Sequence, residues 1–201
     1  MDKYLVLLFV LSITISCKTD KLPILGNKQE VNGQLVHNQI PDFHLTNQFN
    51  QSLRREDLKN KAHLAVFFFT SCPSICPKMM RGLMDIEETY HNEKRLAYLC
   101  YSLDYRRDSI PRLKEYYDKL GIENEQFYLL QGKEKKDIYD LSDEYMSITI
   151  EDDSAPGGFD HSGWIILVDR DFHVRSYCLG TDPKEIDRMK KDIKTLLNEM
   201  D

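Results

Sequence analysis

Two cysteines, Cys72 and Cys76, each followed by a proline, are the residues of this chain best suited to chemistry. They come after residues 66–69, a short aromatic and β-branched run that predicts a buried strand. Proline disfavours the helical region for the residue before it, whereas Pro77 suits the first position of a helix. The sequence therefore predicts that Cys76 caps a helix over residues 77–91, where the helix dipole would lower the pKa of its thiol.

The spacing of the pair carries further information. Three residues separate Cys72 from Cys76, one more than in the dithiol motif of a thioredoxin-like βαβ unit. The longer loop allows the two sulfurs to open around a third body instead of only meeting each other. The pair is therefore predicted to be a reactive dithiol or part of a metal site, with a structural disulfide or two buried thiols as the alternative.

The segments around the pair alternate between strands and helices. Strands are expected at residues 64–69, 96–103, 127–130, 164–168 and 173–178, and helices at residues 77–91, 109–120, 133–144 and 183–200. A hairpin is expected over residues 40–53, because residues 47–50 supply turn formers. This order predicts an α/β fold of thioredoxin type, a three-layer sandwich with an N-terminal hairpin.

The residues before His161 do not fit a minimal fold of this type. Residues 147–150 predict a strand and residues 151–158 a loop, which together form an insertion ahead of the histidine. Where the thioredoxin fold holds a cis-proline beside its dithiol, this chain has His161, because Pro156 lies too far back. We therefore expect the ring of His161 to approach the cysteine pair, the alternative being a structural or exposed histidine.

The N-terminus has the pattern of a targeting segment. Residues 1–16 form a short apolar run after an early lysine, which predicts a signal peptide. Residues 14–17 resemble the lipobox of bacterial lipoproteins, with Cys17 as the lipidated residue; a plain signal peptide and an uncleaved anchor are the alternatives. Residues 17–32 are then a lipidated N-terminus and polar tether, and residues 33–201 the folded domain.

Composition limits the class of protein and of partner. The chain has 201 residues, 41% hydrophobic and 30% charged, which suits one globular domain with a sizeable core. Its formal charge of −6 argues against nucleic-acid binding, because no basic stripe is available to neutralise phosphates.

Three segments together resemble the Sco/SenC family of copper-binding proteins. They are residues 70–77, which hold both cysteines, residues 102–108, and residues 160–162, which hold the histidine. The resemblance covers residues 36–197. One departure is Tyr105, where the family usually has proline, in a loop that supplies no proposed ligand.

The resemblance implies a copper site made by Cys72, Cys76 and His161. In this family such a site serves assembly of the binuclear copper centre in subunit II of cytochrome c oxidase. The implied partners are therefore that subunit or another copper acceptor, and a thioredoxin-like reductant for the cysteine pair. A second departure lies just before the histidine, where residues 157–159 replace the family's usual Tyr-x-Val.

The chemistry of the three donors agrees with this implication. Thiolates are soft ligands that select Cu(I), and imidazole is an acceptable third donor, so the expected cargo is a copper ion, as Cu(I) or Cu(II). A trigonal site of two thiolates and one imidazole leaves an open flank, from which a partner can take the ion. Asp104 or Asp160 would orient the imidazole, unless both are solvated loop carboxylates.

Three functions from different classes remain open at this stage. The first is a copper metallochaperone, which binds without turnover. The second is a thiol–disulfide oxidoreductase, with Cys72 and Cys76 as its redox dithiol, acting on the cysteines of the copper acceptor. The third is a thiol peroxidase, for which Thr70 is present but no arginine lies close before it in the sequence.

The other sulfur-containing residues are expected to belong to the core. Cys100 and Cys178 lie in or near apolar strands, without a second cysteine or a histidine close in sequence. Met79, Met80 and Met84 recur at helical spacing. Both groups are interpreted as buried apolar side chains and not as copper ligands.

Lipidation of Cys17 gives a direct prediction about location. The chain is expected to be a membrane-anchored lipoprotein of a bacterial cell envelope, on its periplasmic face. Mass spectrometry of the protein from a bacterial host should therefore find a diacylglyceryl adduct on Cys17 at a new N-terminus. An unmodified N-terminus at another residue would contradict the prediction.

Overall fold

A computed structural model describes residues 21–147, 149–152, 154 and 158–201, with residues 149, 150, 160 and 161 described by their backbone alone. The strands are β1 (Lys28–Val31), β2 (Gln34–His37), β3 (His44–Asn47), β4 (Ser52–Arg54), β5 (Ala62–Phe68), β6 (Leu96–Ser102), β7 (Phe127–Gln131), β8 (Thr149–Glu151), β9 (Phe159–His161), β10 (Trp164–Val168) and β11 (Val174–Leu179). The helices are α1 (Cys76–Tyr90), α2 (Ile110–Leu120), α3 (Lys136–Glu144) and α4 (Pro183–Glu199).

The main sheet is built around β5. Its described strands lie in the order β11-β10-β5-β6-β7-β3-β4, with β5, β6 and β7 parallel and β10 antiparallel to β5. Every residue of β5 and β6 is buried, as expected of strands covered on both faces.

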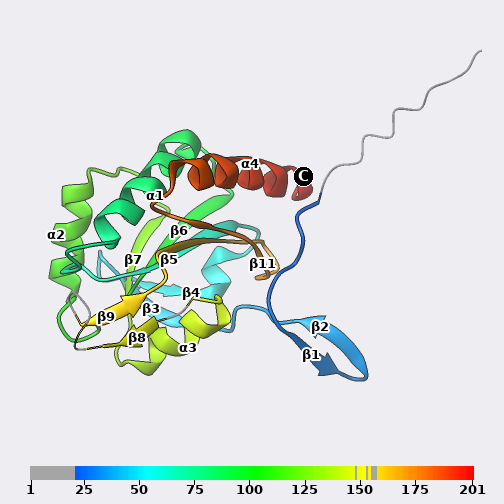
Figure 1. Cartoon of the computed structure of the whole chain (residues 1–201), viewed down its shortest axis with the longest axis horizontal. Coiled ribbons are helices and arrows are strands. Elements are labelled where there is room, and N and C mark those ends of the chain that lie inside the picture. The colour runs from blue at the N-terminus through cyan, green and yellow to red at the C-terminus, as the bar shows by residue number, and fades with distance from the viewer. Residues whose placement is uncertain (1–20, 148, 153, 155–157) are drawn as a thin grey trace, which may run out of the picture.

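Neighbouring residues of β5 point to opposite faces of the sheet, where helices cover them. Phe68 packs against Tyr116 of α2, while Phe67 packs against Tyr145, just after α3. On the first face α1 also packs against α4, and Figure 1 shows α3 on the opposite side of the sheet. The predicted thioredoxin-type three-layer sandwich is confirmed, including the N-terminal hairpin, which is β3–β4, and the inserted strand, which is β8. The structure adds a second strand, β9, which pairs with β8 and was not predicted.

The predicted tether differs from expectation in its second half. Residues 22–25 lie against the domain, since Leu25 N–H donates to the carbonyl of Val174 at 2.8 Å. Residues 28–37 form an antiparallel hairpin, β1–β2, that projects from the body (Figure 1). The predicted signal peptide and Cys17 lie outside the described residues. No helix within the described part of the chain is long and apolar enough to cross a membrane.

A buried polar chain links the sheet to the end of α3. The hydroxyl of Tyr145 lies 2.9 Å from His63 Nε2 and 2.8 Å from the hydroxyl of Tyr101. All three side chains are fully buried, and burial, with Arg55 nearby, lowers the pKa of His63 to about 3, so the ring is neutral. Tyr145 therefore satisfies two buried polar groups at once.

Replacing Tyr145 with phenylalanine is expected to destabilise the fold. Tyr145→Phe leaves His63 Nε2 and the Tyr101 hydroxyl without this partner inside the core. An unsatisfied buried group costs about 1–3 kcal/mol, which should appear as a lower urea midpoint at an unchanged slope.

Tyr98 provides a matched control. It is also fully buried, but its hydroxyl has no hydrogen-bond partner among the described residues. Tyr98→Phe should therefore leave the free energy of unfolding unchanged or raise it. Equal losses in the two variants would show that the hydrogen bonds of Tyr145 contribute nothing.

Candidate metal and dithiol site

The two cysteines lie between the end of β5 and the start of α1. Cys72 is 8% exposed and Cys76 is 1% exposed, so both sulfurs are at the edge of the core. The backbone N–H of Cys76 points at the sulfur of Cys72, 3.5 Å away, and the hydroxyl of Ser74 lies 3.8 Å from the same sulfur. The loop therefore brings polar groups to Cys72 in particular.

The two thiols differ in acidity. Burial acts to raise the pKa of Cys72, but hydrogen bonds from the backbone N–H groups of Ser74 and Cys76, with weaker side-chain bonds from both, outweigh burial and lower it. Burial, with smaller contributions from Cys72 and Asp108, raises the pKa of Cys76 far above its usual value. Cys72 is therefore the thiol that ionises first.

This result corrects the prediction for Cys76. Helix α1 begins at Cys76, with Ile75 at the N-cap position and Pro77 as the second helical residue, so Cys76 is inside the first turn. Its sulfur lies against the core, where the cost of desolvating a thiolate exceeds the help of the helix dipole. The backbone N–H groups of Ser74, in the loop, and of Cys76, at the start of the helix, favour the thiolate of Cys72 instead.

A buried carboxylate fixes the start of the cysteine loop. Asp108 is fully buried and accepts hydrogen bonds from the backbone N–H and the hydroxyl of Thr70, at 2.9 and 2.5 Å, and from the hydroxyl of Ser102, at 2.6 Å. Thr70 is two residues before Cys72, so this carboxylate sets where the loop leaves β5. Sequence reasoning gave Asp108 no role, although it ends the segment 102–108 that carries part of the family resemblance.

An arginine also reaches the loop from α2. Nε of Arg112 donates to the hydroxyl of Thr70 at 2.6 Å and lies 3.7 Å from the carboxylate of Asp108. No arginine lies close before Thr70 in the sequence, but the fold brings Arg112, 42 positions later, to its hydroxyl. The arginine is bound to the hydroxyl of Thr70 and to the carboxylate of Asp108, which holds the loop, and this is a structural role.

The backbone around His161 lies beside the cysteine loop. His161 ends β9, which pairs with β8 so that His161 lies opposite Thr149. Two residues before it, the ring of Phe159 packs on Phe69 with centroids 4.9 Å apart. Two residues after it, Gly163 is so close to Ile75 that a Cβ there would come within 2.5 Å of the isoleucine side chain.

Phe159 and Gly163, two residues before and after His161, thus contact Phe69, which precedes the cysteine pair, and Ile75, which lies between the two cysteines. The side chain of His161 is outside the described part of the structure, so its predicted approach to the sulfurs stays a prediction. Among the side chains that are described, no three histidine, cysteine, aspartate or glutamate residues gather as a possible metal site.

The remaining candidate residues from the sequence are the other sulfur-containing residues and Asp104. Cys100, Cys178, Met79 and Met80 are all buried, and Met84 packs partly buried against the same core, as expected. The sequence allowed Asp104 to be either a solvated loop carboxylate or one that orients the imidazole, and the structure excludes the solvated form. Asp104 is 3% exposed and forms an ion pair with Arg107.

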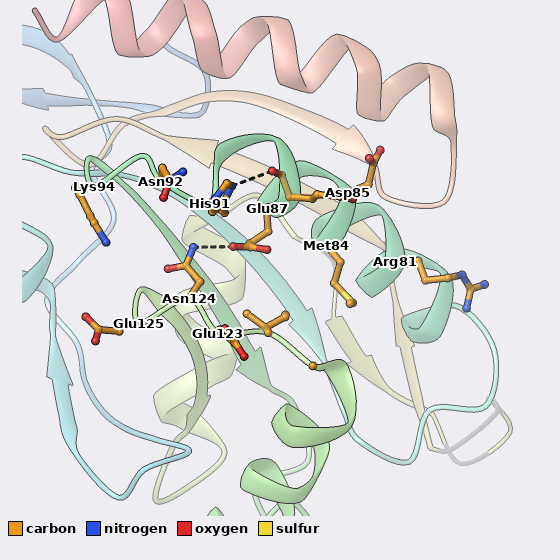
Figure 2. A pocket seen from close by; sticks show the side chains of 13 residues that line it. Arg81, Met84, Asp85, Glu87, His91, Asn92, Lys94, Glu123, Asn124 and Glu125 are labelled. Atoms are coloured by element: carbon orange, nitrogen blue, oxygen red, sulfur yellow. Dashed lines mark hydrogen bonds between the residues drawn. The ribbon is translucent and has the colours of Figure 1, made fainter.

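An open groove of about 1130 Å³ lies apart from the cysteine loop. It runs between the second half of α1 and the connection from α2 to β7 (Figure 2). Five of its lining residues are acidic: Asp85, Glu87, Glu88, Glu123 and Glu125. Glu87 accepts a hydrogen bond from Asn124 at 2.9 Å. Neither cysteine lines the groove, so it is not part of the candidate site.

The arrangement of this site can be compared with known proteins. The family model described as SCO1/SenC matches residues 32–198. The chain belongs to the SCO1/SenC family. It is 29% identical to an SCO2-like protein of Rickettsia conorii, over 88% of this chain and 86% of the relative.

Two solved structures show the same fold. Yeast Sco1 with copper bound is 24% identical, with a TM-score of 0.62, and the match covers 78% of this chain and 88% of that one. BsSco, in which a disulfide switch was identified, is 22% identical, with a TM-score of 0.68 and coverage of 79% and 92%. BsSco is described as a member of the Sco family of cytochrome c oxidase assembly proteins.

The unequal acidity of the two thiols predicts unequal reactivity. Because the thiolate is the nucleophile, Cys72 should be alkylated by iodoacetamide well before Cys76 at neutral pH, and its rate should reach half its maximum below the pH typical of a cysteine. Peptide mass spectrometry of the folded, reduced protein measures both rates.

The single variants sharpen this test. Cys76→Ser should leave a fast-reacting Cys72, whereas Cys72→Ser should leave a slow-reacting Cys76. Cys100 and Cys178, which are fully buried, should stay unmodified in all samples. Faster modification of Cys76 than of Cys72 in the parent protein would refute the assignment.

Proposed function

We propose that this protein is a copper metallochaperone that binds a copper ion through Cys72, Cys76 and His161 and helps assemble the binuclear copper centre of cytochrome c oxidase. The observation that carries the proposal is the contact on both sides of His161, where Phe159 packs on Phe69, just before the cysteine loop, and Gly163 lies against Ile75, between the two cysteines. That contact, in a chain of the SCO1/SenC family, supports an approach of His161 to the dithiol.

The donor set suits a soft monovalent cargo. Two thiolates and one imidazole select Cu(I) over harder ions, and three donors leave a flank open to a partner's ligands. The acidity of the thiols gives the order of binding. Cys72 offers its thiolate readily, while Cys76 gives up its proton only when the metal displaces it, because its buried thiol has a raised pKa.

The surroundings of the site in the cell belong to the same proposal. A lipid on Cys17 holds the domain at a membrane of the bacterial cell envelope, on the periplasmic face, where thiols tend to oxidise. A thioredoxin-like reductant is then needed to restore the dithiol before copper binds. The acceptor is subunit II of cytochrome c oxidase or another copper protein with a similar pair of cysteines.

A second candidate is a thiol–disulfide oxidoreductase that acts on the cysteines of the acceptor. One observation favours it: a low-pKa Cys72 beside a high-pKa Cys76 is the division expected of an attacking and a resolving thiol. The disulfide switch described for BsSco is in keeping with it. Copper binding and dithiol exchange use the same two sulfurs but differ in their need for His161.

His161→Ala is expected to separate the two functions. A three-donor site that loses its imidazole should bind Cu(I) at least 10 to 100-fold more weakly, about 1.4–2.7 kcal/mol, since loss of a ligand's outer-shell partner alone typically has that effect. Anaerobic titration of the reduced variant against a chelator of known affinity measures this. Its reversible Cys72–Cys76 disulfide should remain, because exchange needs only the sulfurs.

His91→Ala is the matched control, because His91 is an exposed histidine at the end of α1. It should bind Cu(I) like the parent. Oxidising the parent to its disulfide should abolish binding, and a reductant should restore it. If His161→Ala binds Cu(I) as tightly as the parent, the copper-site assignment fails and the oxidoreductase becomes the better description.

A further inference from the structure

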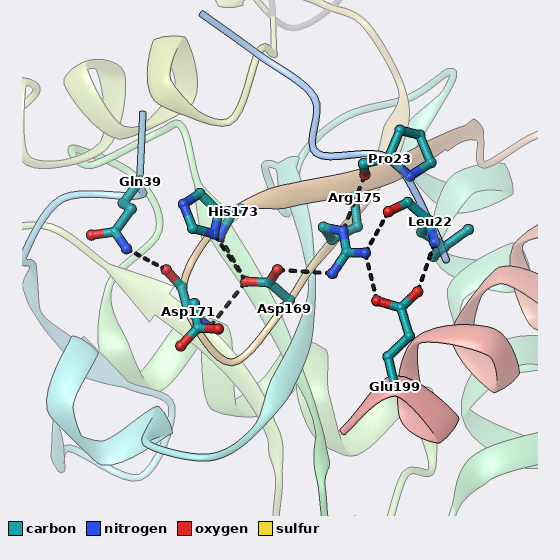
Figure 3. Close-up of polar contacts among 8 residues, drawn as sticks. All are labelled: Leu22, Pro23, Gln39, Asp169, Asp171, His173, Arg175 and Glu199. Carbon is teal, nitrogen blue, oxygen red and sulfur yellow. Dashed lines mark hydrogen bonds and ion pairs between the residues drawn. The ribbon is translucent and has the colours of Figure 1, made fainter. Parts of the chain in front are cut away.

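Residues 22–25, which we call the docking segment, are held to the domain by a buried arginine. Arg175 of β11 donates to the carbonyl oxygens of Leu22 and Pro23, at 2.5 and 3.1 Å, and pairs with Asp169 and Glu199 (Figure 3). The backbone N–H of Leu22 donates to Glu199 at 2.6 Å.

The three charged side chains of this cluster are at most 12% exposed. An ion-paired group so well shielded from water holds its partners more firmly than a surface pair. The chain therefore joins the domain at a fixed point and not through a loose tether.

The register of the sheet shows where that point lies. Val174, at the start of β11, pairs with Val168 of β10, which in turn pairs with His63, near the start of β5. Cys72 follows the other end of β5. The docking segment is therefore at the opposite pole of the domain from the cysteine loop, and Figure 1 shows β1–β2 on the far side of the body from β9.

The pole that holds the docking segment also exposes apolar side chains. Of the seven large hydrophobic residues exposed in the described structure, four fall within residues 24–36: Ile24, Val31, Leu35 and Val36. Leu35 is the most exposed, at 71%. Three of these four lie on the β1–β2 hairpin, and a lone two-stranded hairpin is marginally stable in water. The register of the hairpin places Val31 and Val36 on one face and Leu35, opposite Glu30, on the other, so apolar side chains emerge from both faces. Such a concentration of exposed apolar side chains indicates a part of the molecule that is covered by another body.

The short distance along the chain from the docking segment to Cys17 indicates that the covering body is the lipid bilayer. Leu22 is five residues from Cys17, and five extended residues span about 17 Å at most. A lipid on Cys17 would therefore keep this pole within a short distance of the bilayer. Lys21 and Lys28 lie in the same stretch, as does Glu30, and the two lysines can face anionic headgroups while the apolar side chains of the hairpin enter the interfacial layer.

We propose that the docking segment and the β1–β2 hairpin form a membrane-facing surface that lies on the lipid bilayer and turns the cysteine loop away from it. The proposal rests on the lipid anchor proposed above and is independent of copper binding. It gives the domain a contact with the bilayer through its own side chains, in addition to the lipid on Cys17.

The test uses tryptophan fluorescence, because the chain has one tryptophan, Trp164. Trp164 pairs with Leu179 at the cysteine end of the sheet, so it serves as the reporter for the far pole. The second reporter is Leu35→Trp in a Trp164→Phe background. Each lipidated full-length protein is reconstituted into vesicles of phosphatidylcholine and phosphatidylglycerol, with and without brominated lipid, which quenches tryptophan at short range.

The tryptophan at position 35 should lose most of its emission in brominated vesicles, whereas Trp164 should keep its emission. Equal emission of the tryptophan at position 35 in both kinds of vesicle would overturn the proposal, as would quenching of Trp164. Finding that the bacterial host leaves Cys17 without a lipid would also overturn the proposal. If quenching at position 35 is absent and crosslinking shows a dimer, a second copy of the chain covers the hairpin instead of the bilayer. Copper titration of the same samples reports separately on the proposed function.

Discussion

The site depends on the hydrogen bonds by which Asp108 holds the end of β5. Asp108 is a carboxylate taken fully out of water, which is costly unless each oxygen finds a donor. Its donors come from Thr70, at the end of β5, and Ser102, at the end of β6, so the charge is satisfied only when those two strand ends meet. The cysteine loop leaves the sheet from that junction, so its geometry follows from one buried charge.

The same low-dielectric surroundings make the two cysteines unequal. A thiolate at Cys76 would lie inside the core near the charge of Asp108, whereas Cys72 receives the N–H groups of the turn. In the proposed copper site, both the thiol of low pKa and the thiol of high pKa would have to lose their protons for the metal to bind. The same pair of thiols can equally exchange disulfides. The cysteines alone therefore favour neither proposed function, and the two functions differ in their need for His161.

Much of this was predictable from the sequence, and the limits have physical causes. The apolar run before Cys72 predicted β5, and the proline pattern predicted α1 to within a residue. The acidity of Cys76 was predicted wrongly because local sequence reports the helix dipole but not the depth of burial. Asp108 and Arg175 were missed because polar residues in a loop or on an edge strand are usually solvated. Only tertiary packing shows the partners that hold them inside.

The Arg175 cluster also has a consequence for how the chain folds. It joins Leu22 to Arg175 across 153 positions and to Glu199 across 177, so it is one of the most nonlocal contacts in the molecule. Contacts of such sequence separation form late, because the intervening chain must already be ordered. The docking segment is synthesised before most of the domain, yet it can be fastened only after α4 has packed. Closure of this cluster therefore marks the completion of the fold, and a chain cut short before α4 would keep a loose N-terminus.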